Sequence, residues 1–251
     1  MRLAMRKVTA LFGLYSLYMR LRMREPEVFK DDVAAQGATA RQPLWPSIVA
    51  HKRQALQVIG LTVGPTVVFY VWAVSAPAHA IATRGIAPTS AFWAGVVANI
   101  IFIVLLPLCG RISDRIGRKP VLLTGALGTA VLLFPLNALT GHSAVMLAVA
   151  MSIAMVFIAK PTAIVPAVYA EMFPTHIRTI AVGIPYSIGV AAFGGTAPHL
   201  QELLGTRIGP AWFTLYVILL LLVSAAVISR LPETRGRELH EQAAPPVDAA
   251  A

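Results

Sequence analysis

Long apolar stretches separated by short polar connections dominate the chain. A membrane span needs about 20 apolar residues, and six runs reach that length, at about 58–82, 91–109, 120–139, 144–170, 179–199 and 208–230. Lipid offers no partner for backbone N–H and C=O groups, so each run is expected to be helical. The strand alternation of a membrane barrel is absent from the sequence. The pattern therefore predicts an all-α integral membrane protein with six transmembrane helices across residues 58–230.

The segments outside these runs are polar or short. Val8–Met19 is apolar but would be only about 18 Å long as a helix, so residues 1–57 are interpreted as a helix stub followed by a polar linker. A signal peptide is the alternative, although no small-residue cleavage site follows. Within the linker, residues 47–58 are either an amphipathic surface helix or a solvated stretch. Residues 231–251 are rich in Ala and Pro near their end, and we expect a disordered tail.

The composition fits this organisation. Of the 251 residues, 57% are hydrophobic and 13% are charged, which a soluble domain could not bury. The net charge is +10, but the cations gather at the ends of the runs and not along one polar face with interleaved aromatics. The charge therefore indicates membrane topology and does not favour nucleic-acid binding.

Most cations lie at one set of run ends. These are Arg111, Arg115, Arg118, Lys119, Arg178, Arg230, Arg235 and Arg237, together with the basic residues ahead of the first run. The opposite ends carry only Arg84 and Arg207. By the positive-inside rule, the first set of ends is predicted to be cytoplasmic, which makes the C-terminus cytoplasmic in a multi-pass protein of the inner membrane.

A charged segment between the second and third runs is the least random part of the sequence. Residues 110–120 read Gly-Arg-Ile-Ser-Asp-Arg-Ile-Gly-Arg-Lys-Pro and predict a tight eleven-residue loop. The spacing Gly-x-x-x-Asp-Arg-x-Gly-Arg-Lys resembles the signature loop of the major facilitator superfamily. Residues 170–179, Ala-Glu-Met-Phe-Pro-Thr-His-Ile-Arg-Thr, resemble the turn between helices ten and eleven of its metabolite:proton symporter branch. Residues 232–239, Pro-Glu-Thr-Arg-Gly-Arg-Glu-Leu, resemble the superfamily's exit from helix twelve.

This resemblance implies a fold and a function. It registers the six runs as helices seven to twelve, the C-terminal half of a twelve-helix transporter, with the stub as the end of helix six and helices one to five missing. We then expect proton-coupled symport of a small polar or anionic metabolite, without a cofactor, and completed by an N-terminal half or by a second copy. The alternative is a non-transporting membrane remnant, or a scaffold that pairs with a full transporter or with a separate N-terminal half. No catalytic motif favours an enzyme.

Five residues within the runs are candidates for substrate binding or coupling: Lys160, Asn99, Tyr70, Trp72 and Tyr186. Lys160 is the sharpest, because a charge at that depth costs about 3 kcal/mol and usually faces a cavity or pairs with an acid. Pro161 follows it and is expected to kink the helix. The alternative is that Lys160 extends toward the membrane surface or makes a structural pair. Asn99 must find a hydrogen-bond partner, and the aromatic residues could equally serve packing.

A second set of candidates would form a gate at the cytoplasmic ends: Gly110, Asp114, Arg115, Gly117, Arg118, Lys119, Glu171 and Arg178. Glu171 is expected to pair with Arg178 or with an arginine of the signature loop, the alternative being a solvated surface acid. The resemblance implies that Asp114 would cap a helix in the opposite half. Separately, small residues recur every four positions at Gly183, Ser187, Ala191 and Gly195, and we expect this stripe to pack within the bundle. The histidines show no metal-binding spacing.

Overall fold

The computed structural model describes residues 13, 15–19, 52–141, 143–173 and 178–233. The chain divides into two units, Met1–Arg41 and Gln42–Ala251. Of the first unit, only the helical residues 13 and 15–19 are described, so most of the predicted stub and linker lies outside the described residues. The tail beyond residue 233 does too. The second unit contains the membrane helices.

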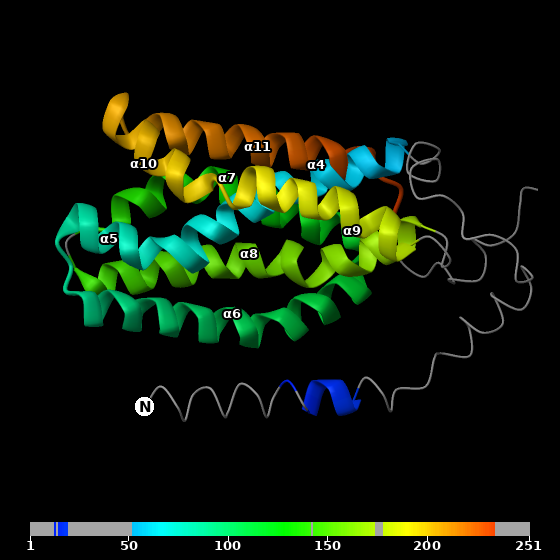
Figure 1. Ribbon diagram of the computed structural model, residues 1–251, viewed down its shortest axis with the longest axis horizontal. Helices are drawn as coiled ribbons and strands as arrows, with labels where there is room; N and C mark the ends of the chain where they lie inside the picture. Colours follow the sequence, from blue (N-terminus) through cyan, green and yellow to red (C-terminus); the bar gives the residue numbers. More distant parts are fainter. Residues whose placement is uncertain (1–12, 14, 20–51, 142, 174–177, 234–251) are drawn as a thin grey trace, which may run out of the picture. The chain divides into compact units, whose positions relative to one another are not determined.

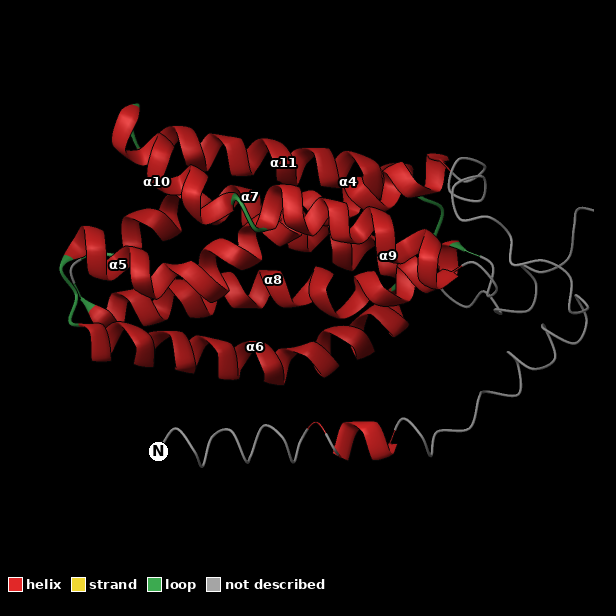
Figure 2. Ribbon diagram, viewed as in Figure 1, coloured by secondary structure: helices red, strands yellow, loops and turns green. Residues whose placement is uncertain are grey.

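Six helices in the described part of the chain are long and apolar enough to cross a membrane, and these residues contain no strand. The prediction of an all-α, six-helix bundle is confirmed (Figures 1 and 2). Four of the six are single α-helices: α6 (Pro88–Ile116), α7 (Arg118–Leu139), α8 (Ala144–Met172) and α11 (Pro210–Arg230). The first is composed of α4 (Lys52–Phe69), η1 (Tyr70–Ser75) and α5 (Ala76–Arg84), and the fifth of α9 (Arg178–Gly189), η2 (Val190–Gly194) and α10 (Ala197–Arg207).

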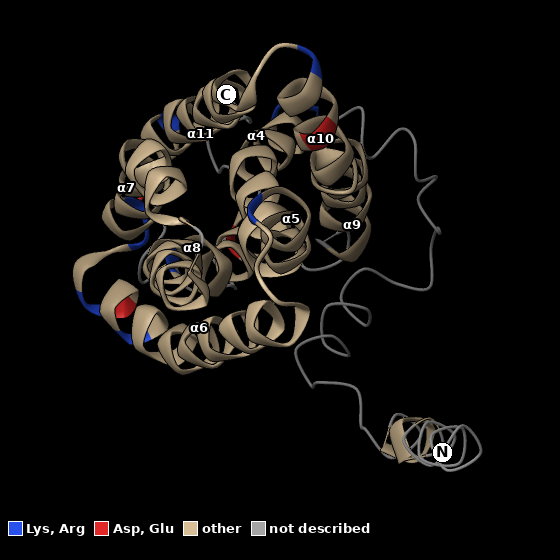
Figure 3. Ribbon diagram, turned by 90° about the vertical axis from the view of Figure 1, so that its left-hand side faces the viewer, with Lys and Arg blue, Asp and Glu red and all other residues tan. Residues whose placement is uncertain are grey.

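The helices pack as a bundle around α4 and α8. Viewed along its axis, α8 lies between α6 and α7, while α11 lies between α7 and α4, and α9 packs on α4 from the other side (Figure 3). Met151, Met155 and Leu221 are among the fully buried side chains. Large apolar side chains such as Val131 and Leu219 are exposed, as expected for a bundle whose surroundings are lipid.

Glycine brings α4 and α11 into close contact. The Ser224 hydroxyl of α11 donates to the Gly60 carbonyl at 2.7 Å and accepts from the Gly64 N–H at 3.1 Å. A Cβ atom at Gly64 would lie 2.9 Å from both the Leu220 oxygen and the Leu221 Cα atom. Because both are backbone atoms, α11 could not relieve the contact by rotating a side chain. This contact has the small-residue and hydroxyl chemistry of helix pairs in lipid.

Two boundaries differ from the sequence prediction. The first membrane helix begins at Lys52, so part of the expected linker is helical and continuous with the span. The charged segment is not an eleven-residue loop, because α6 continues to Ile116 and α7 begins at Arg118, with only Gly117 between them. Charged residues do not oppose helix formation once the helix leaves the lipid, and Gly117, with φ of 106°, makes the break.

Two spans contain a π-helical segment that the sequence did not predict. The segment η1 interrupts the first span, and η2 interrupts the fifth. They lie where the two spans meet, since a Cβ atom at Gly194 would be 2.9 Å from the Tyr70 ring. Pro161 and Pro166 do not interrupt α8, which is a single helix from Ala144 to Met172.

The small-residue stripe of the fifth span is not packed within the bundle. Ser187, Ala191 and Gly195 are exposed, and a Cβ atom at Gly183 would meet nothing within 4 Å. The expectation that this stripe supports packing among the six helices was wrong. It leaves a narrow strip of helix surface that no described residue of this chain covers.

The α4–α11 contact gives a direct test of the fold. Gly64→Ala is expected to destabilise the bundle by about 1–3 kcal/mol, because the added methyl group has only backbone to press against. The matched control is Gly183→Ala, another helical glycine, where the methyl group enters open space. Thermal unfolding of the detergent-solubilised protein should show a lower midpoint for the first variant only. Equal midpoints for both variants would contradict this packing.

Candidate functional site

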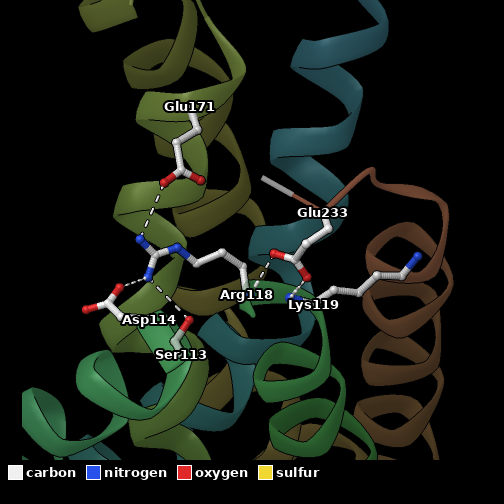
Figure 4. A network of polar contacts seen from close by, with 6 residues as sticks. All are labelled: Ser113, Asp114, Arg118, Lys119, Glu171 and Glu233. Carbon is white, nitrogen blue, oxygen red and sulfur yellow. Dashed lines mark hydrogen bonds and ion pairs between the residues drawn. The ribbon is translucent and has the colours of Figure 1, made fainter. Parts of the chain in front are cut away.

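Six polar residues gather where α6, α8 and α11 end and α7 begins, and we call them the loop-end cluster (Figure 4). Its members are Ser113, Asp114, Arg118, Lys119, Glu171 and Glu233. They come from four segments of the sequence, namely α6, α7, α8 and the residues that follow α11. The signature segment therefore connects the ends of four helices, and not only the two that it joins in sequence.

Arg118 is the centre of the cluster. Its guanidinium is 2.5 Å from Asp114 Oδ1, 3.3 Å from Ser113 Oγ and 3.5 Å from Glu171 Oε1. The Arg118 and Glu171 side chains are 18% and 13% exposed, whereas Asp114 is 63% exposed. The longer contact to Glu171 is thus the better shielded from solvent, and it joins α7 to α8. The expected pairing of Glu171 with a loop arginine is present in the structure.

Glu233 caps the first turn of α7. Its Oε1 atom accepts the backbone N–H of Arg118 at 2.8 Å, and its Oε2 atom accepts that of Lys119 at 3.1 Å. A carboxylate at this position satisfies N–H groups that have no partner within the helix and interacts favourably with the helix dipole. Sequence reasoning missed this residue, because residues 231–251 were interpreted as a tail. An acid three residues beyond the last span, beside a basic loop, was the available signal.

Lys119 makes the reciprocal contact with α11. Its ammonium group donates to the Ser229 carbonyl at 2.5 Å and to the Leu231 carbonyl at 3.2 Å. A cation suits the C-terminal end of a helix, where carbonyl groups lack partners. Glu233 and Lys119 therefore tie the start of α7 and the end of α11 to each other.

Gly117 is required by both backbone and space. Its φ of 106° is unfavourable for a residue with a side chain, and a Cβ atom would lie 2.8 Å from Glu233 Oε2. Two other gate candidates, Gly110 and Arg115, lie on α6 outside the cluster. Arg178 begins α9, but its side chain lies outside the described part of the structure.

A cavity of about 680 Å³ opens between the first, fourth and fifth spans. We call it the neutral cavity, because its described lining contains no Asp, Glu, Lys, Arg or His. It lies in the halves of these spans nearest the loop-end cluster. Its lining is Leu61, Thr62, Pro65, Thr66, Phe69, Tyr70, Pro161, Thr162, Val165, Pro166, Tyr169, Ala170, Thr179, Val182, Gly183, Tyr186 and Val190.

A buried hydroxyl pair fixes one wall of this cavity. Thr62 donates to the Val58 carbonyl at 2.7 Å, and its oxygen lies 2.6 Å from the Tyr169 hydroxyl. The Tyr169 hydroxyl also reaches the Val58 carbonyl at 3.3 Å, so either hydroxyl can be the donor of the Thr62–Tyr169 bond. The Tyr169 ring in turn meets the Tyr186 ring nearly edge to face, with centroids 6.1 Å apart. Tyr169 is 5% exposed and Tyr186 is 44% exposed.

Comparison with known proteins places the chain among transporters. Residues 37–244 match the family "Sugar (and other) transporter". The chain belongs to this family, within the major facilitator superfamily. The family consists of transporters and not of enzymes, as the sequence predicted.

Three curated relatives are similar over most of this chain. The ectoine/proline transporter ProP of Corynebacterium glutamicum is 29% identical over 81% of the chain and 43% of its own length. The alpha-ketoglutarate permease of Escherichia coli is 26% identical over 91% of the chain and 52% of its own length. A putative proline/betaine transporter of Staphylococcus aureus is 26% identical over 80% of the chain and 44% of its own length. The chain spans about half the length of these relatives. No solved structure matches it.

The five predicted substrate residues do not lie together in this transporter-family bundle. Tyr70 and Tyr186 line the neutral cavity. Trp72 does not, and instead lines a second cavity of about 360 Å³ near the opposite end of the bundle. Asn99 lines neither of these two cavities. Its amide donates to the Gly95 carbonyl at 2.9 Å and to the Ala73 carbonyl of η1 at 3.4 Å, which is the partner that a mid-span amide needs.

Lys160 also lies outside the linings of both cavities. It is half-buried on α8, and its ammonium group is 4.4 Å from the centroid of the Phe157 ring. Phe157 packs on Gly128 of α7, so this cation–π contact lies on the α7 side of α8 and away from the neutral cavity. Lys160 therefore lines neither of the two cavities. Among the described residues, no group of three or more His, Cys, Asp or Glu could hold a metal ion.

Removing the Glu233 cap should loosen the start of α7. In Glu233→Ala, the N–H groups of Arg118 and Lys119 lose their carboxylate acceptor, at a cost of about 1 kcal/mol, or about fivefold faster hydrogen exchange at these amides. Glu202→Ala, which removes an exposed acid of α10 at the other end of the bundle, is the matched control and should leave this exchange unchanged. Exchange at the two amides that is insensitive to Glu233→Ala would argue against the cap.

Proposed function

We propose that the chain is the C-terminal half of a proton-coupled secondary transporter for a small polar or anionic metabolite. The observation that carries this proposal is the neutral cavity, which lies among the first, fourth and fifth spans of a transporter-family bundle. Transporters of this type bind substrate near the interface between two repeats and move one repeat against the other. The neutral cavity would be one wall of such a site.

The names of the relatives indicate the class of solute. Proteins described as transporters of ectoine and proline, of proline and betaine, and of alpha-ketoglutarate match this chain. All these solutes are small, polar and carry a carboxylate. We infer a substrate of this size and polarity for the complete transporter.

A second six-helix bundle would complete the site. Thr162, Pro166 and Tyr186 line the cavity yet are exposed, and so is the small-residue stripe at Ser187 and Ala191 beside them. Small residues are suited to close helix contact within a membrane. We propose that an N-terminal half, or a second copy of this chain, covers this surface.

The loop-end cluster would serve as the cytoplasmic gate. The cation distribution supports a cytoplasmic position for this end in the inner membrane. Arg118, Glu171 and Glu233 hold the ends of α7, α8 and α11 together, so these helices would move as one body during transport. Exposed Asp114 is the acid of the cluster best placed to meet a second bundle.

Transport by the chain itself can be measured in proteoliposomes. With an inward proton gradient, we expect accumulation of labelled proline, betaine, ectoine or 2-oxoglutarate that collapses when a protonophore dissipates the gradient. Chemical cross-linking of the same vesicles should show a dimer, since one bundle alone provides only one wall. The matched control is the same vesicles without a gradient.

Two negative results would have different meanings. A cross-linked dimer that accumulates none of the four solutes would exclude transport by a second copy and favour the alternative of a non-transporting partner. Uptake that is unaffected by the protonophore would leave transport intact and overturn proton coupling.

A further inference from the structure

Four aromatic residues line the neutral cavity. Phe69 and Tyr70 line it from the first span, Tyr169 from the fourth and Tyr186 from the fifth. Phe69 and Tyr70 meet edge to face with centroids 6.3 Å apart, as Tyr169 and Tyr186 do at 6.1 Å. Two aromatic pairs thus line one cavity from three separate spans. The negative face of an aromatic ring attracts a cationic group within about 6 Å, and several rings together recognise quaternary ammonium ions.

The described lining of the same wall has no cationic partner for a carboxylate. A protein normally binds a carboxylate with arginine, lysine or several N–H donors, but the described lining has no cationic side chain. Lys160 is next to the lining residue Pro161, but its ammonium group contacts the Phe157 ring, which packs on Gly128 of α7. The charged residues of the loop-end cluster are not part of the lining.

Two hydroxyl groups of the wall already donate their hydrogen atoms to hydrogen bonds within the protein. Tyr169 donates to Thr62 or to the Val58 carbonyl, and Thr162 donates to the Ile158 carbonyl at 2.8 Å. The oxygen atoms of Tyr169 and Thr162 can therefore accept a hydrogen bond but cannot donate one. An acceptor beside aromatic rings suits an ammonium group and does not suit an anion.

We propose that the neutral cavity binds the positively charged end of a zwitterionic substrate, an ammonium group carrying methyl or methylene substituents. This inference rests on the proposed function and narrows it. The carboxylate end of the substrate is then bound outside the described lining of this cavity. A cavity of about 680 Å³ has room for a solute of this kind. A dicarboxylate without an ammonium group finds no complementary charge among the described residues of this lining.

Binding to the chain in nanodiscs tests the proposal without requiring transport. The lipid should be phosphatidylglycerol, which has no ammonium headgroup to compete for the cavity. Three probes separate the charges: tetramethylammonium, glycine betaine and 2-oxoglutarate. In ligand-observed NMR titrations, we expect saturable binding of the first two, mutual competition between them, and at least tenfold weaker binding of 2-oxoglutarate.

Variants of Tyr186 test whether its aromatic ring binds the ammonium group. This residue is 44% exposed, so its replacement should leave the fold intact. Tyr186→Phe keeps the aromatic face and should bind tetramethylammonium within about twofold of the unmodified chain. Tyr186→Leu removes the face and should weaken binding by about three- to thirtyfold. The matched control is Tyr216→Leu on α11, a tyrosine outside the linings of both cavities, which should bind normally.

The possible failures are distinguishable. If 2-oxoglutarate binds and both ammonium probes do not, the cavity is a solute site but the ammonium assignment is overturned. If betaine binds equally well to the unmodified chain and to Tyr186→Leu, aromatic recognition through this residue is overturned. If no probe binds to a chain whose helical circular dichroism is intact, the proposed function of the cavity fails together with the inference.

Discussion

The structure depends on one constraint, which is that every backbone N–H and C=O group in the lipid must be bonded within the protein. It makes each apolar run a helix, and it concentrates unpaired backbone groups at the helix ends. The polar residues of the loop-end cluster act on these ends. Glu233 binds N–H groups at the start of α7, and Lys119 binds carbonyl groups at the end of α11. The charges that stabilise the bundle therefore act largely through the backbone.

The fold was largely predictable, because long apolar runs leave few alternatives. All six spans were found, and errors were confined to their ends and interiors. A helix that leaves the membrane meets water, where charged residues such as Arg111 and Arg115 remain helical, so hydropathy alone misplaces the boundary. The π-helical segments could not be predicted, since they arise from how the first and fifth spans meet at Gly194 and Tyr70. That is a tertiary contact with no local sequence signal.

The site was only partly predictable, because depth in the membrane does not determine direction. Lys160 and Tyr186 both lie within spans, but the orientation of each around its helix axis separates them. Lys160 is on the α7 side of α8, and Tyr186 is at the neutral cavity. The pairing of Glu171 with Arg118 followed from opposite charges at the same level. Tyr169 could not be singled out, because its hydroxyl bond joins positions 107 residues apart.

The π-helical segments change the phase of the two helices that contain them. An α-helix advances by about 100° per residue, and a π turn takes up one more residue than an α turn. Beyond η1, α5 therefore presents a face to α6 that an uninterrupted helix would have turned elsewhere, and η2 does the same for α10 against α11. A single span can in this way pack one face against its neighbours before the π-helical segment and a different face after it. Deleting the one extra residue of either segment would turn its π turn into an α turn and leave the outer portion in register.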